Sequence, residues 1–370
     1  MRLNSRNLAL AAAGLMFGAG TAHAAVFNNS SGDGLWSNAN NWANGDIADS
    51  VGETAQINPS AAQVDANFTI GRLQNSFGTQ TQTISGAGVL TVDAGTANAV
   101  DAIVNVRGAT GGTITIDTGV TVNNGGGGIT RMRNSNSSAN VLAMGPSSTL
   151  NLATAAEVVQ GAGGSVQFNG ALAGTAALRF SHNNVSFGAT SDSPNYAGEL
   201  VFLNNANVTA DTAGGNTFFG GQKFQVNGNA SLTINNAGVL ANTPNVALAG
   251  TPTFNLNVNG NQAFGNLILN NGAVNLTLGA GVTDVDFLPS GAFAWNGSLN
   301  IDNFAPGIVG FGFDGGLSAA QLDLITVDGA APVNPLTLDS EGKLVFVPEP
   351  GSLALLAGGW GLIAFRRRPS

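Results

Sequence analysis

The 370-residue sequence has no cysteine, two lysines and two histidines, and charged residues make up 9% of it. The absence of cysteine excludes a disulfide framework and cysteine-ligated metal sites. Because soluble domains usually carry about 25% charged residues, this surface must be built mostly from uncharged polar groups. The 53 glycines are roughly twice the usual share, which favours a chain with many turns.

The N-terminus has the composition of a secretory signal peptide. Arg2 and Arg6 give it a positive start, and an apolar run follows from Leu8 to Phe17. Ala22 and Ala24 form a small-x-small cleavage site, so we expect residues 1–24 to be removed. The apolar run is too short for a transmembrane helix.

The C-terminal segment, from Val347 to Ser370, combines three parts without a gap. A turn-forming Pro-Glu-Pro motif comes first: Pro348, Glu349 and Pro350. Its two prolines remove backbone donors, so the folded body is expected to end before them. An uncharged apolar run of about 15 residues, 351–365, comes next and is short for a bilayer span. Three arginines end the run and would be held on the cytoplasmic side of a membrane: Arg366, Arg367 and Arg368.

This order of parts resembles the PEP-CTERM sorting signal of Gram-negative bacteria. The resemblance implies that residues 348–370 hold the exported protein in the inner membrane for a time, with the basic end inward. It also implies that an exosortase processes the chain at Pro348–Pro350. An ordinary tail anchor and a buried C-terminal helix are the alternatives.

The body between these two segments is acidic. Five of the 12 basic residues and one of the 21 acidic residues lie in the terminal segments. Residues 25–347 therefore keep seven basic and 20 acidic residues, a formal charge of −13. A basic patch for nucleic acid or anionic lipid is therefore not expected.

From about Phe68, short apolar segments with alternating residues are separated by Gly, Asn, Asp and Thr. Period two with β-branched and aromatic residues predicts strands. The clearest are Val89–Val92, Thr113–Ile116, Val120–Val122, Thr149–Leu152, Ser165–Phe168, Ala177–Phe180, Val185–Phe187, Leu200–Phe202, Lys223–Val226, Ser231–Ile234, Thr253–Val258, Asn266–Leu269, Val274–Leu278 and Ser298–Ile301. No amphipathic helix of useful length is expected between residues 25 and 316.

The spacing of the strands predicts an all-β, right-handed parallel β-solenoid over residues 68–294. Comparable strand starts fall at Leu178, Leu200, Phe224, Val274 and Leu299, and we count the long step from Phe224 to Val274 as two turns. A recurring unit of about 20–25 residues with two or three strands is the signature of a solenoid, whose stacked turns bury one column. Stacked asparagines can add hydrogen-bonded ladders.

An antiparallel β-sandwich is the competing fold. Its hairpins would favour turns such as Asn271-Gly272, between the strands at Leu267 and Val274. The stretch 110–140 is the least regular, and Gly125–Gly128 and Asn134–Ser138 are predicted to be loops.

Both ends of the solenoid are expected to carry caps. Residues 25–67 contain Trp36 and Trp42 among turn residues, which we interpret as a hydrophobic plug in preference to a carbohydrate-stacking site. Their G-x-W…N-W pattern is similar to the opening of bacterial surface proteins with autotransporter-associated β-strand repeats. In residues 295–347 a short helix at Leu317–Leu322, N-capped by Ser318, should precede a hairpin of 336–338 with 344–346. An open last turn would expose unpaired strand edges.

We find no catalytic constellation, cofactor motif or metal motif. A Ser-His-Asp triad would have to use His182, which we interpret as a plain polar residue at a turn. Asp46 with Asp49, and Asp284 with Asp286, can form acid pairs; the second pair can bind a cation at a corner or be solvated. The arginines are spread along the sequence, with two of them in a loop: Arg72, Arg107, Arg131, Arg133 and Arg179.

Two functions from different classes remain. The preferred one is a non-enzymatic, exported surface or matrix protein, whose association with exopolysaccharide is implied by the PEP-CTERM resemblance. Its partners would be an exosortase, the inner membrane during sorting, and a surface glycan. The alternative is a polysaccharide-binding or polysaccharide-cleaving β-helix enzyme, which requires acidic residues with a nearby arginine or lysine along one groove.

Overall fold

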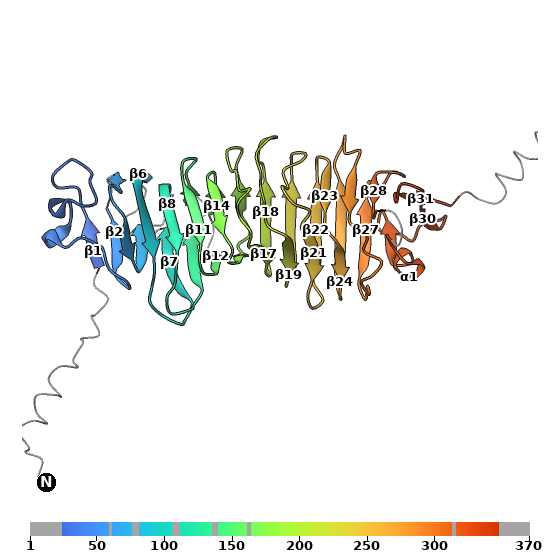
Figure 1. Ribbon diagram of the computed structural model, residues 1–370, viewed down its shortest axis with the longest axis horizontal. Helices are drawn as coiled ribbons and strands as arrows, with labels where there is room; N and C mark the ends of the chain where they lie inside the picture. Colours follow the sequence, from blue (N-terminus) through green and yellow to red (C-terminus); the bar gives the residue numbers. More distant parts are fainter. Residues whose placement is uncertain are drawn as a thin grey trace, which may run out of the picture.

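The computed structural model describes residues 24–58, 61–75, 81–105, 112–134, 140–160, 164–312 and 316–347. They form a parallel β-solenoid of about 10 turns, which confirms the predicted solenoid and excludes the antiparallel sandwich. Figure 1 shows an elongated rod in which the strands cross the long axis and the two described ends lie at opposite ends. We call one turn of the solenoid a rung.

One long side of the rod is an 11-stranded parallel sheet, here called sheet A. Its strands, in order, are β1 (Ala24–Phe27), β2 (Thr54–Ile57), β5 (Arg72–Asn75), β7 (Val100–Asn105), β9 (Thr130–Asn134), β12 (Ala156–Gln160), β15 (Leu178–Ser181), β17 (Glu199–Phe202), β19 (Lys223–Val226), β21 (Asn245–Leu248) and β24 (Leu267–Leu269).

A second, 15-stranded sheet, sheet B, forms the next side and continues around an edge. Its strands are β3 (Ala62–Gln63), β4 (Phe68–Ile70), β6 (Thr81–Val92), β8 (Thr113–Val122), β10 (Val141–Met144), β11 (Thr149–Leu152), β13 (Ser165–Phe168), β14 (Ala171–Gly174), β16 (Val185–Phe187), β18 (Ala206–Ala210), β20 (Ala230–Ile234), β22 (Thr253–Val258), β25 (Ala273–Leu278), β27 (Ser298–Asp302) and β29 (Ile325–Val327). The long strands β6 and β8 bridge two sides, because β10 pairs with the first half of β8 and β11 with the second.

The third side starts with β4, the second halves of β6 and β8, β11 and β14. It ends in a separate sheet of β23 (Gln262–Phe264), β26 (Val285–Phe287) and β28 (Val309–Gly310). Between β14 and this sheet it consists of isolated bridges, Gly174 with Tyr196 and Phe219 with Leu240. A hydrogen bond from Gly238 N to Asn261 O, 3.0 Å, carries this side on to β23. Each rung in this part of the rod therefore runs from sheet B to the third side to sheet A.

The register corrects the rung spacing inferred from the sequence. Leu178, Leu200 and Phe224 are in register in sheet A, and the series continues at Val246 and Leu267. The other two expected starts, at 274 and 299, belong to sheet B. The step from 224 to 274 therefore runs between strands on two different sides of the rod. The alternation of apolar and polar residues is the same on both sides, so it does not distinguish them.

The structure also bears on two turn regions that were named from the sequence. Asn271-Gly272 does not connect a hairpin, since β24 pairs with β21 in sheet A and β25 pairs with β22 and β27 in sheet B. Gly272 has a φ of 93°, which serves the corner between the two sheets. In the stretch 110–140, β8 joins the two strands predicted at 113–116 and 120–122, and Gly125–Gly128 lie in the connection to β9, as predicted. Asn134, which was expected in a loop, is the last residue of β9, and residues 135–138 lie outside the described residues.

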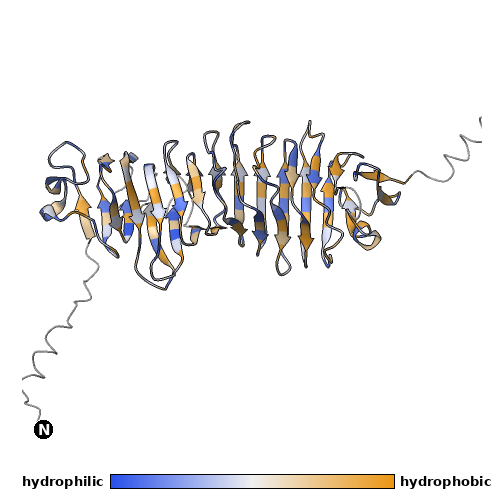
Figure 2. Ribbon diagram, viewed as in Figure 1, coloured by the Kyte–Doolittle hydropathy of each residue, from blue (hydrophilic) through white to orange (hydrophobic). Residues whose placement is uncertain are grey.

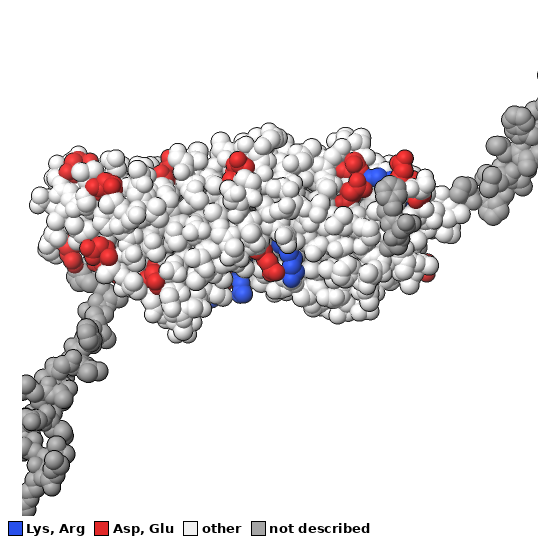
Figure 3. Space-filling model, viewed as in Figure 1, with Lys and Arg blue, Asp and Glu red and all other residues white. Residues whose placement is uncertain are grey.

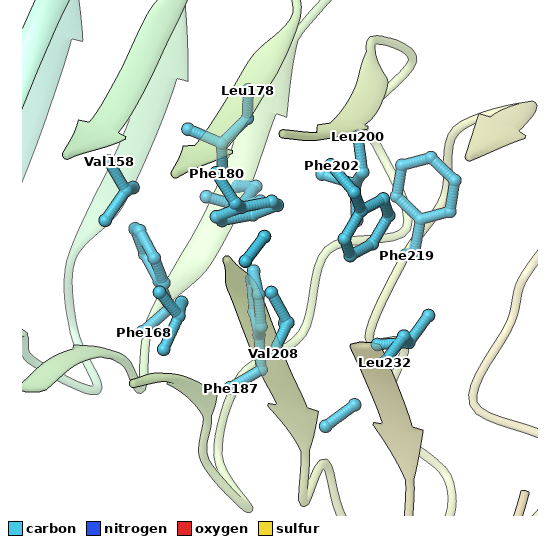
Figure 4. Packing of buried hydrophobic residues seen from close by; sticks show 14 of the residues in the cluster. Val158, Phe168, Leu178, Phe180, Phe187, Leu200, Phe202, Val208, Phe219 and Leu232 are labelled. Carbon is cyan, nitrogen blue, oxygen red and sulfur yellow. The ribbon is translucent and has the colours of Figure 1, made fainter. Parts of the chain in front are cut away.

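Inward-facing side chains of all three sides fill the rod with one continuous apolar column. Phenylalanines dominate its middle, where Phe168 stacks on Phe187 at 4.9 Å and Phe202 lies 5.3 Å from Phe254 between ring centroids. Figure 4 shows several of these rings side by side between the strands. Offset and edge-to-face aromatic pairs add to the burial energy, so the column supports each rung through its neighbours. Figure 2 shows the same alternation of apolar and polar residues along the strands.

The N-terminal end is closed by the loop between β1 and β2, which contains the 3-10 turns η1 (Ala39–Asn41) and η2 (Ala43–Gly45). Trp36 and Trp42 are buried in an edge-to-face pair with centroids 4.9 Å apart, and both pack against Phe27. Trp36 Nε1 donates to Ala48 O at 3.0 Å, and Trp42 Nε1 donates to Trp36 O at 2.7 Å. The pair is therefore a plug, as predicted, and its rings offer no stacking face to a sugar.

The C-terminal end is closed by the helix α1 (Ala319–Leu322) and the antiparallel hairpin β30 (Leu336–Leu338) with β31 (Leu344–Phe346), both as predicted. Ser318 is the N-cap, and Gln321 completes a capping box with it. The Gln321 side chain also donates to Ser290 O and Phe293 O, at 3.0 and 2.8 Å. In chain order, α1 follows β28 and precedes β29, so it takes the place of a sheet A strand in the last rung.

Candidate functional site

The residues expected to direct sorting lie outside the described residues: Pro348, Glu349, Pro350, Arg366, Arg367 and Arg368. Ala22 of the predicted cleavage site also lies outside them, and Ala24 is the first residue of β1, paired with Thr54. The described chain ends at Val347, whose backbone N–H donates to Pro335 O at 2.8 Å. None of the helices among the described residues has the length and apolar character needed to cross a membrane.

His182 lies at a turn, as expected, but the sequence did not indicate its burial. It lies between β15 and β16 and is fully buried. Its Nδ1 accepts a hydrogen bond from the backbone N–H of Asn184 at 2.9 Å, while Nε2 is buried with no hydrogen bond to any described residue. Burial lowers the pKa of His182, which favours the neutral ring. The side chain therefore caps a turn and has none of the contacts of a catalytic base in the described chain.

The acid pair Asp284 and Asp286 holds a cation, and that cation is the ammonium group of Lys343. Lys343 Nζ bonds to Asp286 Oδ1 at 2.6 Å and also contacts Asp284 Oδ1. Gly310 makes room for this contact, because a Cβ there would clash with Asp286 Oδ1. Burial alone would lower the pKa of Lys343, but its hydrogen bonds to the two carboxylates raise it. We call this contact the Lys343 latch; it ties the C-terminal hairpin to the third side.

The other acid pair, Asp46 and Asp49, lies in the N-terminal loop. Nearby, the Glu53 carboxylate accepts hydrogen bonds from the backbone of Asp49 and Ser50 at 3.0 and 3.2 Å. In the described chain, no three His, Cys, Asp or Glu side chains lie together in a way that could hold a metal ion.

Three of the arginines come together on the outer face of sheet A, which corrects the expectation that they are dispersed. Arg131 and Arg133 lie in β9, and Arg133 Nη1 is 3.1 Å from Asp101 Oδ2. Glu157 of β12 pairs in register with Arg131 on one side and Arg179 on the other. We call these five residues the arginine strip.

The arginine strip was missed because its members are far apart in the sequence. Arg131 and Glu157 are separated by one complete rung of the chain, and so are Glu157 and Arg179. The sequence signal that could have found it is the recurrence of charged residues at a spacing of one rung. Arg131 Nε lies 3.8 Å from Glu157 Oε2, and the side chains of Arg131 and Arg133 are 36% and 37% exposed, so the ion pairs are partly solvated.

Sheet B presents a different outer face, with amide and hydroxyl groups in register. Ser231 Oγ donates to Asn207 Oδ1 at 2.8 Å, and Asn275 Nδ2 donates to Asn255 Oδ1 at 2.8 Å. These contacts confirm the expected side-chain ladders along the rod. Figure 3 shows that charged side chains gather in a few places on the visible face, while most of that face is uncharged.

A hollow of about 580 Å³ lies where sheet A turns into sheet B. Asparagines from successive corners line it, with small residues and hydroxyl groups beside them: Asn183, Asn205, Ala206, Asn229, Ala230, Ser231, Thr253 and Asn255. None of these side chains is ionisable. The hollow can therefore accept and donate hydrogen bonds but supplies no acid, base or nucleophile of the usual catalytic kinds.

Comparison with protein-family models, with curated proteins and with solved structures finds no match for this chain.

Proposed function

We propose that this chain is an exported structural protein of the cell surface or extracellular matrix, sorted by an exosortase through residues 348–370 and associated with exopolysaccharide in a biofilm. One observation carries the proposal. The body is closed by the hairpin β30–β31, which ends at Phe346, and the Pro-Glu-Pro motif begins shortly after it, at Pro348. A processing enzyme would therefore meet its motif directly beside a finished fold.

The acidity and low charge content of the body support the same function. Residues 25–347 have a formal charge of −13, which keeps the protein soluble and disfavours binding to nucleic acid or anionic lipid. A rod with a plug at one end and a latched hairpin at the other protects its sheet edges, as a stable extracellular element needs. The Pro348 motif would then set where the rod is delivered.

Deletion of residues 348–370 tests the sorting step. We expect the truncated protein to lose its normal distribution between membrane, cell surface and medium, measured by fractionation and immunoblotting of a Gram-negative host that contains the exosortase. The matched variant Pro348→Ala/Pro350→Ala keeps the apolar run and the arginines. It should be inserted but not processed, with an uncleaved C-terminus by mass spectrometry. Unchanged delivery of both variants would exclude exosortase sorting.

The arginine strip favours a second candidate, a polysaccharide-binding or polysaccharide-cleaving β-helix enzyme. It places Glu157 between Arg131 and Arg179 on one face, and guanidinium groups can bind the carboxylates of acidic sugars. An activity screen on acidic and neutral polysaccharides tests it. Product formation that disappears in Glu157→Gln would replace the structural function with this one.

A further inference from the structure

The hollow between sheets A and B opens on the outer face of the corner. Ala206 and Ala230 occupy the same register position in β18 and β20, and the next strand carries Phe254 there. All three side chains are buried in the apolar column, so Ala206 and Ala230 contribute mainly backbone to the hollow. The depression is bounded by Asn183 at one end and Thr253 at the other.

Two of the asparagine side chains at this corner, those of Asn183 and Asn205, do not bond to the described residues of the neighbouring rung. Elsewhere, corner asparagines bond to the next rung, as Asn259 Nδ2 does to Asn235 Oδ1 at 2.7 Å. The side chains of Asn183 and Asn205 are exposed and make no hydrogen bond within the described residues. Asn229 Oδ1 accepts from Thr253 N at 2.8 Å, which orients its amide and leaves the NH₂ group available. The hollow thus presents one oriented amide, that of Asn229, and the unpaired amides of Asn183 and Asn205.

We propose that this hollow binds a neutral polysaccharide chain lying along the axis of the rod. Amides and hydroxyls match the alternating donors and acceptors of sugar hydroxyls. A charged ligand would find no countercharge among the lining residues, and a polyanion would be repelled by the body. The proposal rests on the polysaccharide association in the proposed function and names its chemical class.

The repeat of the solenoid favours a polymer over a single sugar. Asn205 and Asn229 precede register partners in neighbouring strands, so they lie one rung apart, about 4.8 Å. Equivalent groups at a fixed spacing can bind successive units of a repeating ligand. Because the lining contains no aromatic ring, each sugar contributes little, and affinity must come from several units bound at once.

The full-length protein is tested by affinity electrophoresis through gels that contain dextran, hydroxyethyl cellulose or the anionic polysaccharide alginate. We expect retardation by at least one neutral polysaccharide and none by alginate. The variant Asn183→Ala/Asn205→Gly removes both free amides, and glycine retains the backbone of Asn205, whose φ is 65°. Loss of two hydrogen-bonding groups should weaken binding about tenfold.

The control is Asn44→Gly/Asn98→Ala, which removes two exposed amides from the N-terminal part, one of them also at positive φ, 62°. It should bind as the unmodified protein does. Unchanged binding of the Asn183/Asn205 variant, retardation by alginate alone, or no retardation in either neutral gel would overturn the proposal. Surface delivery, measured by fractionation, is independent of these results, so failure of this site and failure of the proposed function are distinguishable.

Discussion

Buried polar side chains of this protein replace backbone partners at places where the chain turns. The Tyr196 hydroxyl accepts from Leu178 N at 3.0 Å and lies 2.9 Å from Ala176 O, so it joins the third side to sheet A. Burial raises the pKa of Tyr196, because the phenolate would lose its hydration there. His182 works in the same way through Nδ1, but its second nitrogen has no hydrogen bond among the described residues. Protonation of this buried ring is therefore opposed by the fold, so pH acts on stability through His182.

We predict that the free energy of unfolding falls as the pH drops below about 6.5, the ordinary pKa of histidine. The folded pKa of His182 is lowered, so below this pH the unfolded chain binds a proton that the folded chain does not. Stability then decreases with falling pH, by at most about 1.4 kcal/mol per pH unit for one proton. Urea unfolding between pH 5 and pH 8 measures this slope.

His182→Asn is the matched variant, because its Oδ1 can accept the hydrogen bond from Asn184 and cannot be protonated in this range. His182 is the only histidine in residues 25–347. The slope between pH 5.5 and pH 7 should therefore flatten in this variant. An equal slope in both proteins would show that another group is responsible.

At the scale of elements, the Lys343 latch is the contact that fixes the last hairpin to the solenoid. Only 15% of the Lys343 side chain is exposed, compared with about half of each aspartate side chain. The raised pKa of Lys343 means that its stabilising contribution is fully present at neutral pH. That contribution is lost only as the pH rises through the folded pKa, which is above 10.5.

We predict that Lys343→Met loosens the hairpin without unfolding the rod. Partly solvated ion pairs contribute up to about 1 kcal/mol each, so global stability should fall by about that amount. Hydrogen exchange of residues 336–347 should become much faster, because the hairpin can then open locally without the free-energy cost of breaking the Lys343 latch.

Lys223→Met is the control for this variant, since Lys223 is the other lysine of the chain and forms a single exposed pair with Glu199 at 3.4 Å. It should leave exchange of residues 336–347 unchanged. Equal protection of the hairpin in both variants would show that the latch does not hold it.

Alternation and turn residues were sufficient to predict about half of the strands, the helix at Ser318 and the final hairpin, because these depend on local sequence. They were not sufficient to assign strands to sides. Phe224 and Val274 have the same local pattern but belong to sheet A and sheet B. The arginine strip, the latch and the hollow all join residues from different rungs, so each required the register.

The whole molecule is nearly one-dimensional, because each rung contacts mainly the rungs before and after it. Stability of such a rod is approximately a sum of rung and interface contributions. Removing one complete period should therefore shorten the protein and preserve its fold. Leu178 and Leu200 occupy the same register position in neighbouring strands of sheet A, so the stretch from one to the other defines such a period.

We predict that deletion of residues 178–199 gives a folded protein, since Ala177 then continues into Leu200 at the equivalent place. Its urea m-value should fall by about 7%, in proportion to the surface lost. Circular dichroism should retain the strand spectrum and a cooperative transition. Deletion of residues 178–188, half a period, is the control and should prevent folding. If the two deletion proteins unfold in the same way, the stability of the rod is not a sum of separate rung contributions.

The orientation of the strands also determines how the rod responds to mechanical load. Strands lie across the axis and their backbone hydrogen bonds lie along it, while the described ends are at opposite ends of the rod (Figure 1). Tension applied through the two ends loads the rung-to-rung hydrogen bonds in series, so they open one rung at a time. Each opened rung releases about 22 residues, or roughly 75 Å of extended chain. A protein tethered between a cell and its surroundings would thereby lengthen in steps and dissipate a pull before its attachment fails.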